Sequence, residues 1–134
     1  TLEFASRNGP ELVFSRGGRV RAAGPDEPLL VVTTVSRRVE EDQRAEFCST
    51  LVSSMREFSD VTPLAKGPIE ADGMKGCELL AQGINRGTKR PGLVYEAVLF
   101  ESGRYYAFRG IAGIRWRAQY VQEFARMARR ITRR

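Results

Sequence analysis

The chain has 134 residues with 22 Lys or Arg, 16 Asp or Glu and no histidine, which gives a net charge of +6. This length predicts one domain covering residues 1–134, large enough to bury a core without a metal or disulfide. No apolar run approaches the roughly 20 residues that cross a bilayer, and the absence of histidine excludes Ser-His-Asp and Cys-His catalysis.

The first 28 residues have the least regular pattern. Residues 11–15 and 19–23 flank Arg16-Gly17-Gly18 and predict a first hairpin, because glycine tolerates the positive φ of tight turns. Residues 29–36, "LLVVTTVS", are rich in β-branched side chains with little polar alternation, which is typical of a central strand.

Residues 40–58 change to a helical period. Phe47, Leu51, Met55 and Phe58 recur at the spacing that places apolar side chains on one helix face. The acidic residues at the start of this segment suit the first turn of a helix, and Pro63 marks its end. The pattern therefore predicts a helix over 40–58.

Strands follow this helix. Residues 62–71 predict an edge strand because Gly67-Pro68 interrupts it, and residues 73–83 predict a strand with Cys77, Leu79 and Ala81 on one face. The next nine residues, "INRGTKRPG", predict a loop. Loops on rigid scaffolds often carry function, so its cations are candidate partner contacts, with a merely exposed polar loop as the alternative. These cations are Arg86, Lys89 and Arg90.

The stretch 96–110, "EAVLFESGRYYAFRG", predicts a hairpin with a two-residue turn at Ser102-Gly103. In that register Glu96 faces Arg109, and both faces of the ribbon are largely apolar. A helix over 115–131 follows, with apolar positions at Trp116, Tyr120, Phe124, Met127 or Ala128, and Ile131. One helix on each face would cover the ribbon, so the predicted class is α+β: an antiparallel sheet in a three-layer α/β/α sandwich. Glu96 and Arg109 would then form a semi-buried ion pair.

The sequence contains no catalytic, cofactor or metal motif. It has no glycine-rich phosphate loop and no dinucleotide fingerprint, so we expect no cofactor. Cys48 and Cys77 are too few and too far apart for structural zinc; buried free thiols are the favoured interpretation, with a disulfide as the alternative if the protein is exported. We expect a protein that is not an enzyme, although a cleft with paired carboxylates remains a third hypothesis.

The excess positive charge lies at the C-terminal end. Residues 1–114 hold 15 basic and 15 acidic residues, whereas residues 115–134 hold seven Arg and one Glu. Such a helix can bind nucleic acid or an anionic surface, although a solvated helix face is the favoured interpretation. The candidate contacts are Arg126, Arg129, Arg130, Arg133 and Arg134.

The order of these elements resembles the PsbP-like superfamily over residues 29–134. The resemblance lies in a strand, the helical "EEDQRAEFCSTLVSSM", a strand near "KGCELLAQG", the stretch "YEAVLFESGRYYAFRG" and a terminal amphipathic helix. It implies a non-catalytic binding or assembly role, with a protein partner or a homo-oligomer favoured over nucleic acid. Because the superfamily includes many exported bacterial proteins, the resemblance slightly favours export over a cytoplasmic location.

Overall fold

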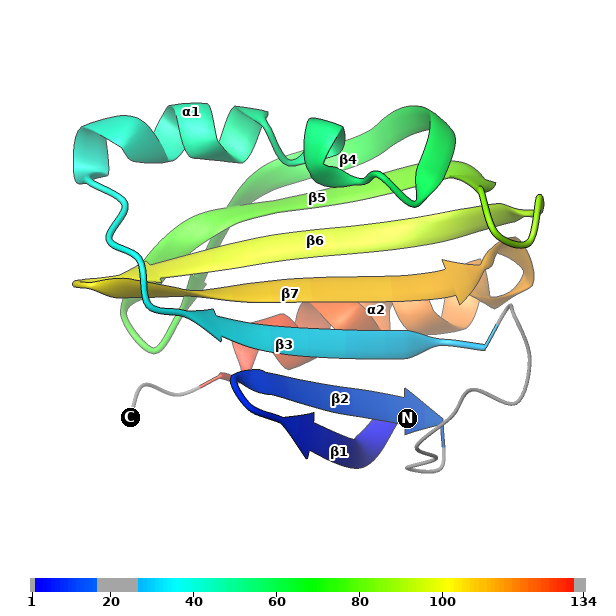
Figure 1. Ribbon diagram of the computed structural model, residues 1–134, viewed down its shortest axis with the longest axis horizontal. Coiled ribbons are helices and arrows are strands. Elements are labelled where there is room, and N and C mark those ends of the chain that lie inside the picture. Colours follow the sequence, from blue (N-terminus) through cyan, green and yellow to red (C-terminus); the bar gives the residue numbers. More distant parts are fainter. Residues whose placement is uncertain (1, 17–26, 132–134) are drawn as a thin grey trace.

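The computed structural model describes residues 2–16 and 27–131, which form an α+β domain as predicted. The strands are β1 (Leu2–Asn8), β2 (Glu11–Arg16), β3 (Leu29–Val35), β4 (Phe58–Ala71), β5 (Met74–Asn85), β6 (Pro91–Glu101) and β7 (Arg104–Gly113). The helical elements are η1 (Glu41–Gln43), α1 (Arg44–Ser49), η2 (Val52–Ser54), η3 (Ile114–Trp116) and α2 (Arg117–Arg129). The strands form one antiparallel sheet in the order β1-β2-β3-β7-β6-β5-β4 (Figure 1).

The β6–β7 hairpin has the register that the sequence predicts. Glu96 pairs with Arg109 and Glu101 with Arg104 across the turn, where Gly103 has a φ of +87° that favours glycine. Val98 and Phe100, on the face that also bears Glu96, are buried. Tyr105 on the same face is partly buried, so most of this face is removed from solvent.

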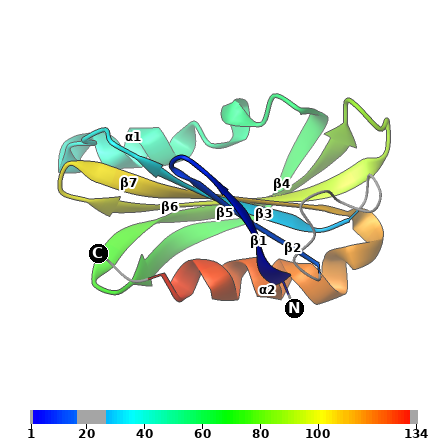
Figure 2. The same ribbon diagram turned by 60° about the horizontal axis from the view of Figure 1, so that its bottom comes forward.

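Alternation along the strands divides the buried side chains into two clusters. On one face Tyr95, Leu99 and Phe108 cluster with Tyr120 and Phe124 of α2. On the other, Val98 and Phe100 cluster with residues of the segment that contains α1 and η2. Figure 2 shows α2 beneath the sheet and the α1 segment above it.

The prediction of one helix over 40–58 is wrong in length, although its apolar face is right. The residues predicted to form that face all join the second cluster, but α1 ends at Ser49 and Phe58 already belongs to β4. The hydroxyls of Ser49, Thr50, Ser53 and Ser54 each donate to a carbonyl three residues earlier. Such local bonds favour tight turns over a continuing α-helix.

The first hairpin lies earlier than predicted. β1 pairs with β2 across Gly9-Pro10, and Gly9 has a φ of +60°. The other edge of β2 pairs with β3, so residues 11–15 lie between β1 and β3. The part of the prediction that falls on residues 17–26 lies outside the described residues. β3 is central and β4 is an edge strand, as predicted.

Cys48 and Cys77 form a disulfide, so the favoured interpretation of free thiols is wrong. Their Cα atoms are 6.1 Å apart, and the bond links the end of α1 to the first half of β5. Both cysteines pack against the second cluster. What the sequence could not give was the register of α1 over β5, which brings the two sulfurs together.

Candidate binding groove

Two adjoining hollows lie between the C-terminal part of α2 and strands β1, β2, β3 and β7. Their volumes are about 550 and 330 Å³, and Leu12, Val32, Arg130 and Ile131 line both. We call them together the arginine-rimmed groove. Its other lining residues are Leu2, Arg7, Pro10, Phe14, Leu30, Thr34, Ser36, Arg104, Tyr106, Phe108, Glu123, Arg126 and Met127.

The smaller hollow has an apolar floor. Phe14, Leu30 and Phe108 project from three neighbouring strands, and Met127 of α2 lies across from them. Beside this hollow the ring of Phe4 contacts that of Phe14 edge-on, with 5.9 Å between centroids. Phe4 is 56% exposed, so much of its ring is open to solvent. Apolar surface therefore remains accessible at this end of the groove.

Of the ten described residues that line the larger hollow, six carry a side-chain hydrogen-bond donor. Arg7, Thr34 and Ser36 line it on one side, and Arg104 lies over the ring of Tyr106 at 5.2 Å from its centroid. The Nε of Arg104 also donates to Glu101 Oε1 at 2.8 Å, and this hydrogen bond raises the pKa of Arg104. These groups suit a ligand that carries acceptors.

Positive charge dominates the groove. Among the described residues, its lining includes four arginines and one acid, Glu123. Glu123 is buried and already accepts from Arg126 and, at 3.4 Å, from the backbone N–H of Leu2. Arg7 donates to the carbonyl of Gly9, and no described carboxylate pairs with Arg7 or Arg130. An incoming anion would therefore find arginine donors that are still available.

The arginines predicted as contacts at the C-terminal end do not all lie in the groove. Arg126 and Arg130 line the groove, with the side chain of Arg126 52% exposed and bonded to Glu123. Arg129 instead donates to Glu78 at 2.9 Å, and this carboxylate also accepts from the hydroxyl of Tyr95 at 2.6 Å. Burial, reinforced by Glu78, raises the pKa of Tyr95, so its hydroxyl stays a donor. Arg129 thereby links α2 to the sheet.

The remaining predicted contacts do not lie in the groove. Arg86, Lys89 and Arg90 are exposed on the short turn between β5 and β6, at the opposite end of β6 from Arg104. The side-chain oxygen of Asn85 accepts from two backbone N–H groups of this turn, and Lys89 has a φ of 61°. Arg133 and Arg134 lie outside the described residues.

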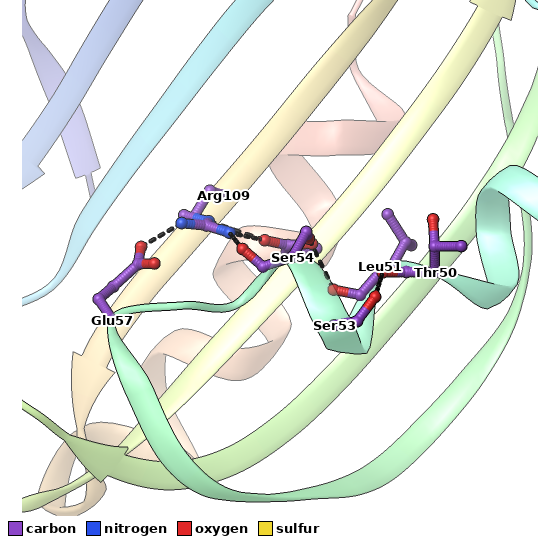
Figure 3. A network of polar contacts seen from close by, with 7 residues as sticks. Thr50, Leu51, Ser53, Ser54, Glu57 and Arg109 are labelled. Atoms are coloured by element: carbon purple, nitrogen blue, oxygen red, sulfur yellow. Dashed lines mark hydrogen bonds and ion pairs between the residues drawn. The ribbon is translucent and has the colours of Figure 1, made fainter.

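On the opposite face of the sheet, the predicted ion pair belongs to a polar network (Figure 3). Arg109 Nε donates to Glu96 Oε1 at 2.7 Å, while its other nitrogens contact Glu57 and, at 3.2 Å, the carbonyl of Ser54. Ser54 Oγ also donates to Glu96 Oε2 at 3.2 Å. Burial raises the pKa of Glu96 although Arg109 opposes it. The network ties η2 and the turn before β4 to β6 and β7.

This network joins separate elements of the fold. Its carboxylates, Glu57 and Glu96, both contact the same arginine, and Glu96 also accepts from the hydroxyl of Ser54. In the part of the chain that the structure describes, no three His, Cys, Asp or Glu side chains gather as metal ligands. Within residues 2–16 and 27–131, no helix has the length and apolar character needed to span a membrane.

Sequence reasoning missed most of the groove. Leu12, Val32 and Arg130 come from three elements, and only the fold brings them to one place. The charge count pointed to Arg130, but no sequence signal placed Arg7 or Arg104 near it. These arginines are separated by nearly the whole chain, so spacing rules could not connect them.

Known proteins resemble this chain only in fold. No family model and no curated protein matches it. A Pseudomonas aeruginosa protein of unknown function, PA94, superposes with a TM-score of 0.70 at 11% identity, covering 97% of this chain and 87% of its own. LpqN, involved in cell envelope biogenesis of Mycobacterium tuberculosis, has a TM-score of 0.62 at 10% identity, with coverages of 96% and 75%. The Saccharomyces cerevisiae Ran-binding protein Mog1p has a TM-score of 0.56 at 10% identity, with coverages of 89% and 69%. The chain therefore shares an α+β fold with proteins of diverse roles.

Proposed function

We propose that this chain is a non-catalytic module that binds a protein partner through the arginine-rimmed groove. The observation that carries this proposal is the groove itself, where accessible apolar side chains lie next to Arg7 and Arg130, with which no described carboxylate pairs. Protein interfaces combine an apolar centre with a polar rim, and arginine and aromatic residues are enriched in them.

The fold relatives support this proposal in general terms. We propose a three-layer α/β/α sandwich of the PsbP-like type, an architecture compatible with the likeness to Mog1p, a Ran-binding protein. Because that likeness rests on 10% identity, it supports a protein partner without naming one.

A basic module that binds nucleic acid or an anionic surface is the weaker alternative. It would need a row of free cations along α2, but Arg126 and Arg129 already donate to Glu123 and Glu78. Phosphate binding depends on Lys and Arg side chains that can neutralise the backbone, so these pairs compete with it.

A pair of matched substitutions tests the proposed groove. Leu12→Arg places a long charged side chain where the two hollows meet, whereas Leu64→Arg makes the same change at an exposed position on the edge strand β4. Affinity capture at physiological salt supplies the partner, and calorimetry with the purified partner measures binding. We expect Leu12→Arg to weaken binding by at least about tenfold and Leu64→Arg by less than about twofold.

Circular dichroism and thermal unfolding of each variant show whether it is folded, so a loss of binding can be assigned to the groove. Equal binding by wild type and Leu12→Arg, or an equal loss in both variants, would place the interface elsewhere. Recovering no protein that binds stoichiometrically would count against the protein-binding role itself.

A further inference from the structure

We propose that the arginine-rimmed groove takes an acidic segment of the partner, with a large apolar side chain in the smaller hollow and neighbouring carboxylates on the arginines of the larger one. This inference rests on the proposed function and narrows it to a partner chemistry. It uses the arrangement of side chains in the groove and needs no likeness to another protein.

The first step is that the two hollows are continuous. Both hollows share four lining residues, Leu12, Val32, Arg130 and Ile131. Two side chains of one bound segment, a few positions apart, could therefore occupy the two hollows at once. Arg130 stands where the apolar floor meets the donor-lined end. A single short segment can therefore reach both environments.

The smaller hollow still has apolar surface that a ligand could cover. Leu30 and Phe108 are buried at the base of the smaller hollow, while Phe14 and Met127 are only partly buried. A large apolar side chain seated here would remove the accessible parts of Phe14 and Met127 from water, which is the main source of affinity at protein interfaces. A uniformly polar segment would leave this apolar surface in contact with water and would gain no affinity from it.

The third step concerns charge at the donor-lined end. Arg7, Arg104 and Arg130 line the larger hollow, and no acid does so among the described residues. Arg104 already donates to Glu101, so Arg7 and Arg130 are the donors that an incoming carboxylate would meet. Carboxylates accept two parallel hydrogen bonds from a guanidinium group, so Asp or Glu side chains match these donors. A basic segment would be repelled, which gives the groove selectivity as well as affinity.

The apolar end also separates this ligand from a nucleic acid. Phosphates could meet the arginines, but a backbone of sugars and phosphates has no aliphatic or aromatic side chain to enter the hollow lined by Phe14 and Met127. Base stacking needs an open aromatic platform, whereas Phe14 has its ring edge-on to Phe4.

The experiment selects ligands without assuming a partner. Random peptides of about 12 residues, displayed on phage, are selected on the purified wild-type chain at about 150 mM NaCl. The enriched peptides are synthesised with a fluorescent label and titrated against wild type, Arg130→Glu, Arg86→Glu and Leu12→Arg by anisotropy. Arg86→Glu is the matched control, because it makes the same charge reversal on the exposed β5–β6 turn.

We expect the selected peptides to place Asp or Glu next to Phe, Trp or Leu. We expect Arg130→Glu and Leu12→Arg each to weaken binding by at least about tenfold, and Arg86→Glu by less than about twofold. Affinity should also fall as salt rises, because part of the attraction is between charges. Thermal unfolding confirms that each variant is folded.

The results that would overturn the inference also separate it from the proposed function. Peptides without acids, or binding that Arg130→Glu leaves unchanged while Leu12→Arg abolishes it, would keep the groove as the interface but refute the acidic segment. Binding that neither substitution affects would refute both proposals. Two further measurements, calorimetry with dodecanoate and analytical ultracentrifugation of the chain alone, test for other occupants. Dodecanoate binding when no peptide is selected, or self-association sensitive to Arg130→Glu, would give the groove a different occupant.

Discussion

At the residue scale, Glu96 shows how burial and pairing compete. Its side chain is only 8% exposed, yet it accepts from Arg109 and from the hydroxyl of Ser54. Desolvation is the larger effect, and it raises the pKa of Glu96 above its ordinary value of 4.5. The carboxylate is therefore less stable in the folded protein than in the unfolded chain, although its partners reduce the difference.

This balance predicts how pH changes stability. Because the folded state holds the Glu96 proton more tightly, its contribution is fully present below about pH 4.5 and is lost as pH rises through the raised pKa. Glu96→Gln cannot titrate. We therefore expect the free energy of unfolding of wild type, relative to Glu96→Gln, to fall as pH rises above about 4.5. Denaturant unfolding of both proteins between about pH 4 and 7 measures this difference.

The Gln variant serves as its own control, since the other titrating groups are common to both proteins and largely cancel in the difference. A difference that is constant with pH would show that Arg109 and Ser54 fully offset burial, and one that grows in favour of wild type as pH rises would show that they outweigh it.

At the element scale, the sequence predicts a strand or helix correctly where one hydrophobic period continues along the whole element. The β6–β7 hairpin was predictable in register because Ser102-Gly103 is a compact turn between two apolar runs. The helix over 40–58 was not predictable in length. Its apolar period was correct, but the hydroxyls of Thr50 and Ser54 bond to nearby carbonyls and replace α-helix with tight turns.

The lining of the groove could not be predicted from the sequence, because it depends on contacts between distant elements. Phe14, Val32 and Arg130 share a surface only because β2 pairs with β3 while α2 returns across the same face of the sheet. Sequence periodicity reports which way a side chain points along its own element, and it contains no information on how distant elements are placed. The net charge signalled a basic surface without locating its apolar neighbour.

The disulfide is the strongest covalent constraint on α1, an element of only six residues. Cys48 and Cys77 are 29 positions apart, and closing a loop of this length restricts the unfolded chain. The chain-entropy model gives a stabilisation of about 3–4 kcal/mol. We expect the double variant Cys48→Ala/Cys77→Ala to lose about this free energy of unfolding while keeping the fold. Urea unfolding followed by circular dichroism measures the loss.

Wild type treated with dithiothreitol is the control for side-chain volume, because reduction breaks the bond without removing either sulfur. If reduction leaves the free energy of unfolding within about 1 kcal/mol of the oxidised value, the loop-closure argument does not hold here. A loss confined to the Ala variant would point to packing in the second cluster as the cause.

At the scale of the whole molecule, folding redistributes a charge that the sequence concentrates at one end. Arg129 lies in the basic terminal segment, but it pairs with Glu78, which comes from β5 and is 51 positions away. Arg126 pairs with Glu123 on its own helix. The seven arginines of residues 115–134 are therefore less available to a polyanion than their number suggests.

Because two of these arginines are already paired, we expect nucleic-acid binding to be weak and its affinity to depend only slightly on salt concentration. If only Arg130, Arg133 and Arg134 met phosphates, the logarithm of the binding constant for single-stranded DNA would fall with log salt at a slope of about −2. Glu78→Gln removes the carboxylate opposite Arg129 and should steepen the slope by roughly 0.7 while keeping an acceptor for Tyr95. Fluorescence anisotropy with a labelled oligonucleotide between about 20 and 200 mM NaCl measures both slopes. A wild-type slope steeper than about −4 would mean that the glutamate pairs open on binding, and the basic module would then replace the protein-binding groove as the leading function.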